Sequence, residues 1–271
     1  MPNAEGSLAG RVIVETRPEG LEAEDEELAL PNSLVDRGAK VFSTPAIRLI
    51  AAPRRPLDRA ARDLVAGGYD WAIFTSRTGV EAIYFALARV AAAFPDVRAR
   101  IASVGEPTME ALRMFGAEPD LVPPTFTTAA LGRVMPRGRG RVLLARADIA
   151  PDALESAVAS KGWTTVRVDA YRTRLVKRLR GGAAAALRTN RVDAVTFTSA
   201  STVEGFLLMT RALRERGVAM PPAVCIGPVT AAAARDAGLR VAAVARPHTI
   251  EGLVAALERA LGPRPSTKKE R

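Results

Sequence analysis

Cysteine and histidine are almost absent from this sequence, which contains one residue of each, Cys225 and His248. A single cysteine excludes an internal disulfide framework and every CxxC motif. The same scarcity excludes zinc sites of the usual composition, and leaves only one pair that could form a Cys–His dyad. We therefore expect no metal site. Cys225 lies in an apolar run and is expected to be a buried filler, and His248 a loop or capping residue.

Long apolar runs are also lacking. No stretch approaches the roughly 18 consecutive apolar residues of a membrane-spanning helix. The opening segment, MPNAEGSLAG, has neither the basic start nor the apolar centre of a signal peptide. We therefore expect no membrane association and a cytoplasmic location.

Aromatic residues make up only 5% of the chain, whereas its formal net charge is +10. A basic surface suits nucleic acid, an anionic membrane or a polyanionic small molecule; a general preference for arginine would give the same balance. Binding of single-stranded nucleic acid uses stacking aromatics among the basic residues, and no helix-turn-helix or RNP-like segment is present. We therefore expect no nucleic-acid partner.

Short apolar runs alternate with helical stretches along the 271 residues. Each run is nearly continuous in apolarity, as in strands buried on both faces of a parallel sheet. Apolar residues at helical spacing occur over 80–90 and 203–213. The alternation predicts an α/β fold with doubly wound parallel sheets. The expected strands are 12–14, 71–75, 101–104, 142–144, 194–197 and 223–226.

The chain repeats itself at an offset of about 122 residues. FTSRTGVEAIYFAL, from position 74, resembles FTSASTVEGFLLM, from position 197. SVGEPTMEALRMFGAE, from 103, resembles CIGPVTAAAARDAGLR, from 225, and Leu131 falls opposite Leu253. Two copies of one α/β unit explain this pattern. The repeat alone places the join at the basic, glycine-rich segment 136–140, and 263–271 is expected to be a flexible tail.

Hydroxyl residues and glycines mark the strand-to-helix junctions of both copies. Thr78 with Glu81, and Ser201 with Glu204, have the spacing of a capping box. Hydroxyls at Thr75, Ser76, Thr198 and Ser199 exceed what capping requires, and Gly105 and Gly227 allow a tight turn or a close approach of ligand. Helix N-termini of this kind bind anions, although the same residues could simply cap their helices. No P-loop or GxGxxG motif is present.

These residues together resemble the uroporphyrinogen-III synthase family. The resemblance covers the chain from about Arg11 to Leu261. Its motifs are short, but they occur in the family's order: TRP from 16, DWAIFTS from 70, VGEPT from 104, DAYRT from 169, DAVTFTSASTV from 193 and IGPVTAAAARDAGL from 226.

The resemblance implies the reaction and the architecture. Family members close the linear tetrapyrrole hydroxymethylbilane to uroporphyrinogen III, inverting ring D and losing water, without a metal or organic cofactor. Two similar doubly wound α/β domains are joined by a two-stranded linker, with the active site in a cleft between them. The implied domains are 1–42 plus 175–271 and 48–168, with 43–47 and 169–174 as connecting strands. The alternative class is a two-lobed module that binds a small molecule without catalysis.

The resemblance also assigns roles to residues. Tyr171 aligns with a catalytic tyrosine that would donate a proton to the departing hydroxyl, or orient it. Arg17 and Arg146 occupy turns after the first strand of each copy, where guanidinium groups suit carboxylates. We expect a monomer that contacts the enzyme supplying its substrate only transiently. The expected substrate-binding residues are Arg17, Thr75, Ser76, Arg77, Gly105, Thr108, Arg146, Thr198, Ser199, Ala200, Ser201, Gly227, Pro228 and Thr230.

Overall fold

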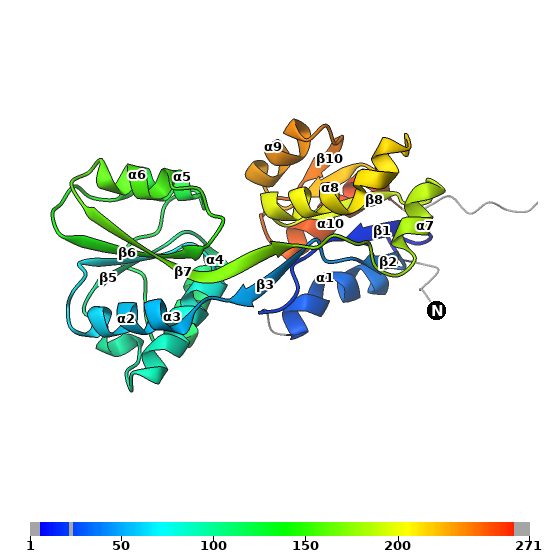
Figure 1. Cartoon of the computed structure of the whole chain (residues 1–271). Helices are drawn as coiled ribbons and strands as arrows, with labels where there is room; N and C mark the ends of the chain where they lie inside the picture. Colours follow the sequence, from blue (N-terminus) through cyan, green and yellow to red (C-terminus); the bar gives the residue numbers. More distant parts are fainter. Residues whose placement is uncertain (1–5, 22–23, 263–271) are drawn as a thin grey trace, which may run out of the picture. The chain divides into compact units, whose positions relative to one another are not determined.

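The computed structural model describes residues 6–21 and 24–262, so the segment 263–271 lies outside the described residues. The chain divides into two compact units, one of Met1–Arg48 with Arg174–Arg271 and one of Leu49–Thr173. Both divisions fall inside strands, in β3 (Ile47–Ala51) and β7 (Thr164–Leu175). The chain therefore passes from one unit to the other twice, each time within a strand (Figure 1).

The first unit is a parallel sheet with the strand order β10-β9-β8-β1-β2. Numbered by position along the chain within this unit, that order is 2-1-3-4-5, which is a doubly wound arrangement. Its strands are β1 (Val12–Glu15), β2 (Lys40–Ser43), β8 (Ala194–Phe197), β9 (Ala223–Cys225) and β10 (Val241–Val244). Its helices are α1 (Glu24–Asp36), α7 (Ala183–Arg188), α8 (Ala200–Glu215), α9 (Pro228–Asp236) and α10 (Ile250–Leu261).

Alternating side chains of the first sheet pack into two separate hydrophobic cores, one on each face. Ile13 packs with residues of α1 and α10 on one face, and Val14 packs with residues of α7, α8 and α9 on the other. Cys225 belongs to the second of these clusters and is fully buried. The expectation that it is an apolar filler is therefore confirmed. Burial on both faces explains why the strands consist of near-continuous apolar runs.

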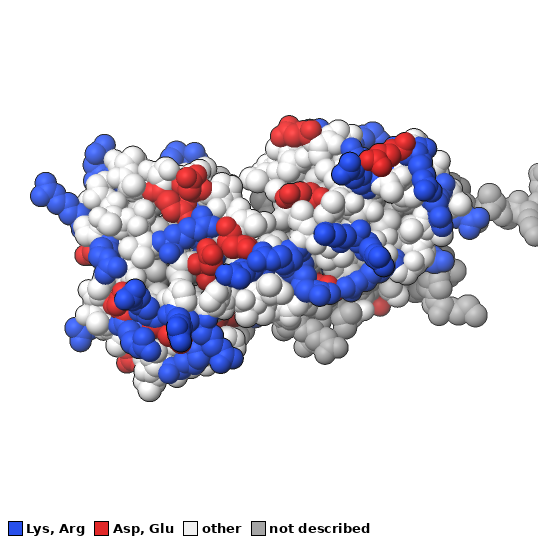
Figure 2. Space-filling view, in the orientation of Figure 1, with Lys and Arg blue, Asp and Glu red and all other residues white. Residues whose placement is uncertain are grey.

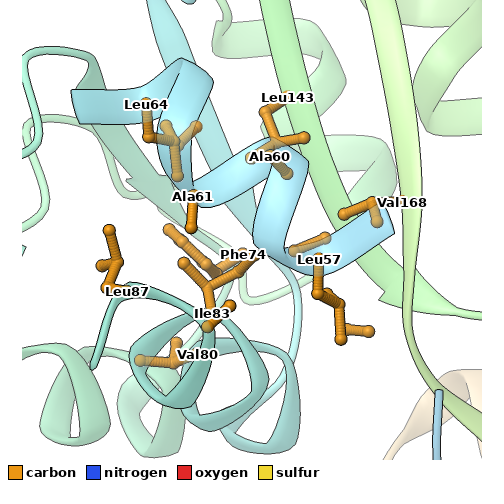
Figure 3. Close-up of a cluster of buried hydrophobic side chains, with 14 of the residues drawn as sticks. Leu57, Ala60, Ala61, Leu64, Phe74, Val80, Ile83, Leu87, Leu143 and Val168 are labelled. Atoms are coloured by element: carbon orange, nitrogen blue, oxygen red, sulfur yellow. The ribbon is translucent and has the colours of Figure 1, made fainter. Parts of the chain in front are cut away.

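The second unit has the sheet order β3-β7-β6-β4-β5, with parallel pairing among β4, β5, β6 and β7. Its further elements are β4 (Trp71–Phe74), β5 (Arg100–Ser103), β6 (Arg141–Ala147), α2 (Arg54–Val65), α3 (Arg77–Arg89), α4 (Glu106–Met114), α5 (Thr128–Val134), α6 (Ala153–Ala159) and a 3₁₀ turn at Phe94–Asp96. Figure 3 shows Leu57 and Leu64 of α2 and Ile83 of α3 packed around Phe74. On the opposite face, α5 and α6 pack against Trp71 and Ile73.

The two units share the same arrangement of strands and helix caps. Strands β9, β8, β1 and β2 of the first sheet correspond in order to β5, β4, β6 and β7 of the second. Thr127 and Thr249, 122 residues apart, each cap a helix by accepting the backbone N–H three residues later. Leu131 and Leu253 are both fully buried. The expected fold of two similar doubly wound α/β domains is confirmed.

The segment 43–47 is not the connecting strand that the resemblance implied. Strand β2 ends at Ser43 and β3 begins at Ile47. Between them the backbone continues alongside the end of β1, where Thr44 N–H donates to the Glu15 carbonyl at 2.9 Å and Ala46 N–H to the Thr16 carbonyl at 3.2 Å. Helix α8 lies close to this segment, because a Cβ on Gly205 would lie only 2.1 Å from the Ala46 oxygen.

Two other expected boundaries fall inside larger structure. The segment 169–174 is the second half of β7, a continuous strand that begins at Thr164. The glycine-rich segment 136–140 lies within the second unit, where Gly138 N–H donates to the Lys161 carbonyl at 3.1 Å. Trp163 Nε1 donates to the Pro136 carbonyl at 2.8 Å. A basic, glycine-rich composition therefore marks a packed turn here and not the join between units.

Candidate active site

The order of strands in each sheet reverses at one point. In the first unit the reversal lies between β1 and β8, and in the second between β4 and β6. In open α/β sheets, ligands bind beyond the carboxyl ends of the strands at such a point. Arg17 follows β1, Thr198 and Ser199 follow β8, and Thr75 and Ser76 follow β4. The structure thus places most of the expected hydroxyl residues at the two reversals.

The helices that follow β4 and β8 are capped two residues earlier than the capping-box pattern predicted. Ser76 Oγ accepts the Gly79 N–H at 3.1 Å, and Ser199 Oγ accepts the Thr202 N–H at 3.2 Å. Thr78 and Ser201 instead lie within the first helical turns. The prediction was wrong because the strands end at phenylalanine, before the threonine, so the serine becomes the last non-helical residue.

A buried threonine follows the next strand of each unit. Thr108 lies in the first turn of α4 and is 4% exposed, and Thr230 lies in the first turn of α9 and is 5% exposed. Among the described residues, neither hydroxyl makes a hydrogen bond. A hydroxyl that has no protein partner keeps its capacity to form hydrogen bonds with solvent or a ligand. The same arrangement occurs twice, at equivalent positions 122 residues apart.

The glycines before these two helices are not needed for their backbone conformation. Gly105 has a φ of −160° and Gly227 a φ of −162°, which any residue adopts. The tight-turn interpretation is therefore wrong at both positions. A Cβ would also fit at both positions in ordinary van der Waals contact, 3.4 Å from Phe126 at Gly105 and 3.7 Å from His248 at Gly227. Pro228 opens α9 as expected, since a helix needs no N–H at its first residue.

Arg146 does not lie in a turn, contrary to expectation. It is inside β6 and 4% exposed, and its Nη1 donates to Glu155 Oε2 at 2.5 Å and to the Pro151 carbonyl at 2.8 Å. Its guanidinium therefore serves the packing of α6 against the strand. Arg77 pairs with Glu81 at 3.1 Å. Arg17 follows β1, and its backbone N–H donates to Glu15 Oε1 at 2.6 Å.

Tyr171 lies in β7, half-buried, opposite Ala147 at the carboxyl end of β6. The Asp148 N–H donates to the Tyr171 carbonyl at 3.1 Å, and Asp148 Oδ1 accepts the Thr173 N–H at 2.8 Å. Sequence reasoning missed Asp148. The available signal was its place as the first acidic residue after an apolar run, beside the reversal between β4 and β6.

Electrostatics near the end of β1 are set by Glu19. Burial by itself would raise the pKa of Glu19, but hydrogen bonds and charges from Arg180 and Arg48 outweigh it and hold that pKa below its usual value. The Glu19–Arg180 and Glu19–Arg48 contacts are 2.6 and 2.7 Å. Figure 2 shows Lys and Arg over many parts of the visible face, with Asp and Glu among them. The net charge alone therefore does not locate the site.

Metal-ligand clusters and membrane-spanning helices are both absent from the described residues. Over the part of the chain that the structure describes, no three His, Cys, Asp or Glu side chains gather as metal ligands would. Across residues 6–21 and 24–262, no helix has the length and apolarity required to cross a bilayer.

Comparison with known proteins identifies the family. The family model described as uroporphyrinogen-III synthase HemD matches residues 29–255. A uroporphyrinogen-III synthase of Synechococcus elongatus is 31% identical over 267 residues, covering 94% of this chain and 97% of that protein. The crystal structure of a mutant uroporphyrinogen III synthase from Thermus thermophilus superimposes with a TM-score of 0.69 at 25% identity, covering 93% of this chain and 98% of that one. The Helicobacter pylori uroporphyrinogen-III synthetase, at 16% identity and a TM-score of 0.52 over 90% of this chain and 97% of its own, shares the fold. With a family model over most of its length and a relative that it covers almost completely, the chain belongs to the uroporphyrinogen-III synthase family.

Proposed function

We propose that the helix N-termini at the carboxyl ends of the parallel strands bind the carboxylates of hydroxymethylbilane. As a uroporphyrinogen-III synthase, the chain is a hydro-lyase that acts on this substrate. A linear tetrapyrrole carries many acetate and propionate groups, and helix N-termini offer backbone N–H groups and a favourable dipole to such anions. The proposed binding residues are Arg17, Thr75, Ser76, Arg77, Gly105, Thr108, Thr198, Ser199, Ala200, Ser201, Gly227, Pro228 and Thr230.

The observation that carries this proposal is the pair Thr108 and Thr230. Each is a nearly buried threonine whose hydroxyl has no partner among the described residues, in the first turn of a helix that follows a parallel strand. A bound carboxylate would accept from both the hydroxyl and the neighbouring backbone N–H groups. Arg146 is left out of the binding set, because its guanidinium is already paired with Glu155.

Tyr171 is proposed to assist the loss of water. Its phenol proton passes to the departing hydroxyl of the substrate, the carbon–oxygen bond breaks, and water leaves. The substrate's own pyrrole nitrogen supplies the electron pair that this departure requires. Closure with ring D inverted requires the bond from ring D to its existing methylene bridge to break and to re-form at the other α carbon of that ring. The proton released on closure returns to the Tyr171 phenolate. The protein orients the chain for these steps, a contribution that can be worth roughly 7–11 kcal/mol. We propose that the chain acts as a monomer, which light scattering would test.

The activity is tested by supplying hydroxymethylbilane, oxidising the products and separating isomers I and III by chromatography. We expect isomer III to dominate over the isomer I that forms spontaneously. Accumulation of isomer I alone, at the spontaneous rate, would contradict the assignment. It would favour the alternative of a binding module without catalysis.

The role of Tyr171 is tested with Tyr171→Phe. We expect kcat to fall about 10²-fold, the scale of general acid catalysis, with little change in KM. Tyr84→Phe is the matched control, because Tyr84 stacks on Phe115 at a 3.9 Å ring separation within the packing of the same unit. Tyr171→Phe with a wild-type kcat would remove the proton-donor role.

A further inference from the structure

Phe126 and His248 occupy the same position in the two units. Phe126 immediately precedes Thr127, the residue that caps α5, and His248 immediately precedes Thr249, the residue that caps α10. The two ring-bearing residues are 122 residues apart, which is the offset of the repeat. The register that places Leu131 opposite Leu253 also places Phe126 opposite His248, although the two residues differ in chemistry.

Each of these side chains lies against the glycine turn that precedes a threonine of the proposed site. A Cβ on Gly105 would lie 3.4 Å from the Phe126 Cβ and 3.6 Å from its Cγ. A Cβ on Gly227 would lie 3.7 Å from the His248 Cγ and 3.8 Å from its Nδ1. In both units a ring therefore stands beside the helix N-terminus that carries Thr108 or Thr230.

Both side chains are exposed. Phe126 is 52% exposed, and it is one of few aromatic residues, since these make up only 5% of the chain. His248 is exposed as well, and its Nδ1 lies 2.8 Å from the Ala245 carbonyl. That contact holds the imidazole ring in place and assigns the proton of the neutral ring to Nδ1. Among the described residues, Nε2 makes no hydrogen bond.

We propose that Phe126 and His248 contact the pyrrole rings whose carboxylates are bound at the neighbouring helix N-termini. This inference rests on the proposed function, since it requires the Thr108 and Thr230 turns to hold carboxylates. Acetate and propionate arms are short, so a carboxylate held at the turn brings its pyrrole within reach of the adjacent side chain. Flat π-systems pair favourably in stacked or edge-on arrangements, worth about 0.5–1.5 kcal/mol for each pair.

The two positions differ in chemistry. Phe126 offers only an apolar ring, whereas His248 offers a ring with a nitrogen that can pair with a polar group of the substrate. Each ring therefore presents different chemistry to the pyrrole that it contacts. Because ring closure depends on how each pyrrole is oriented, the rings would contribute to which isomer forms as well as to affinity.

The inference is tested with Phe126→Ala and His248→Ala in the isomer-resolved assay. We expect each KM to rise about 3- to 10-fold, which corresponds to the loss of one aromatic contact, and the fraction of isomer I to increase. Phe126→Tyr and His248→Phe keep a ring, so their KM should lie closer to the wild-type value than the KM of the alanine variants. Phe85→Ala and Leu208→Ala remove exposed apolar side chains elsewhere in the same two units, 57% and 36% exposed, and serve as matched controls.

The outcomes separate this inference from the function on which it rests. Wild-type KM and isomer fractions in Phe126→Ala and His248→Ala, alongside raised KM in Thr108→Val and Thr230→Val, would overturn the ring contacts alone. Unchanged kinetics in all four variants would overturn the carboxylate site as well. Phe126→Leu keeps apolar volume without a ring. If it behaves as wild type while Phe126→Ala is impaired, volume and not the ring is responsible, and the inference fails.

Discussion

Ser76 and Ser199 hold the same position in the two units, each as the last residue before a helix whose first turn it caps. Their hydroxyl oxygens accept backbone N–H groups three residues later, at 3.1 and 3.2 Å. A hydroxyl that accepts a hydrogen bond still has its own proton to donate. Capping and carboxylate binding are therefore compatible functions of one side chain, and they can be separated by substitution.

Ser76→Asp and Ser199→Asp should leave stability nearly unchanged but raise KM. Aspartate caps a helix as well as serine does, whereas its charge repels a carboxylate. Ser→Ala at the same positions should instead lower the free energy of unfolding by about 1 kcal/mol, because the cap is lost. Thermal unfolding and steady-state kinetics measure the two effects. An Asp variant with the wild-type KM would show that the serine only caps.

The buried pair of Arg146 and Glu155 should matter for stability and not for substrate affinity. Their side chains are 5% and 12% exposed, so Glu155→Ala leaves a buried guanidinium without its partner. We expect the free energy of unfolding to fall by about 3 kcal/mol. The exposed Arg113–Glu118 pair of the same unit is the control, where Glu118→Ala should cost less than about 1 kcal/mol.

Tryptophan fluorescence during denaturant unfolding suits this comparison, because both tryptophans, Trp71 and Trp163, lie in the unit that contains these two ion pairs. The KM of folded Glu155→Ala should stay close to wild type. A large rise in KM without a loss of stability would return Arg146 to the substrate-binding residues.

Cys225 should make the protein less stable in alkaline solution. Burial raises the pKa of its thiol from 9.0 to about 11 in the folded chain. The contribution of the buried neutral thiol to the free energy of unfolding is fully present below pH 9. It is lost as the pH rises from 9 towards 11, because only the unfolded thiol ionises in that window. The loss is on the order of 2–3 kcal/mol.

Unfolding followed by circular dichroism at pH 8.5 and pH 11 measures this dependence. Cys225→Ala removes the ionisable group, so its stability should fall less between the two pH values than that of the wild type, since other groups titrate equally in both. An identical fall in the two proteins would contradict the burial of the thiol.

The strands were predictable where burial dictates composition. The expected strand over 194–197 has the bounds of β8, because a strand buried on both faces can hold little besides apolar residues. The first half of β7 was missed: Thr164, Arg167 and Asp169 interrupt its apolar pattern, and the strand forms through pairing with β6. Such pairing is a long-range interaction that a local pattern does not contain.

The repeat indicated where the candidate site lies, but not which hydrogen bonds its residues make. The repeat led to the junctions at Ser76, Thr108, Ser199 and Thr230, which lie at the carboxyl ends of strands. It did not identify which hydroxyl caps each helix, since the end of a strand depends on its neighbours. The partner of Arg146 was equally hidden, because Glu155 comes from the following helix.

The central claim is that two equivalent threonines bind substrate carboxylates, and Thr108→Val with Thr230→Val tests it most directly. Valine keeps the shape of threonine and removes a hydroxyl that has no partner among the described residues, so neither variant should lose stability. The measurement is kcat/KM for hydroxymethylbilane in the two single variants and the double variant. The account predicts a drop of about tenfold for each and a larger drop when both are combined, which corresponds to one hydrogen bond to a charged group per site. A double variant with wild-type kcat/KM would contradict it.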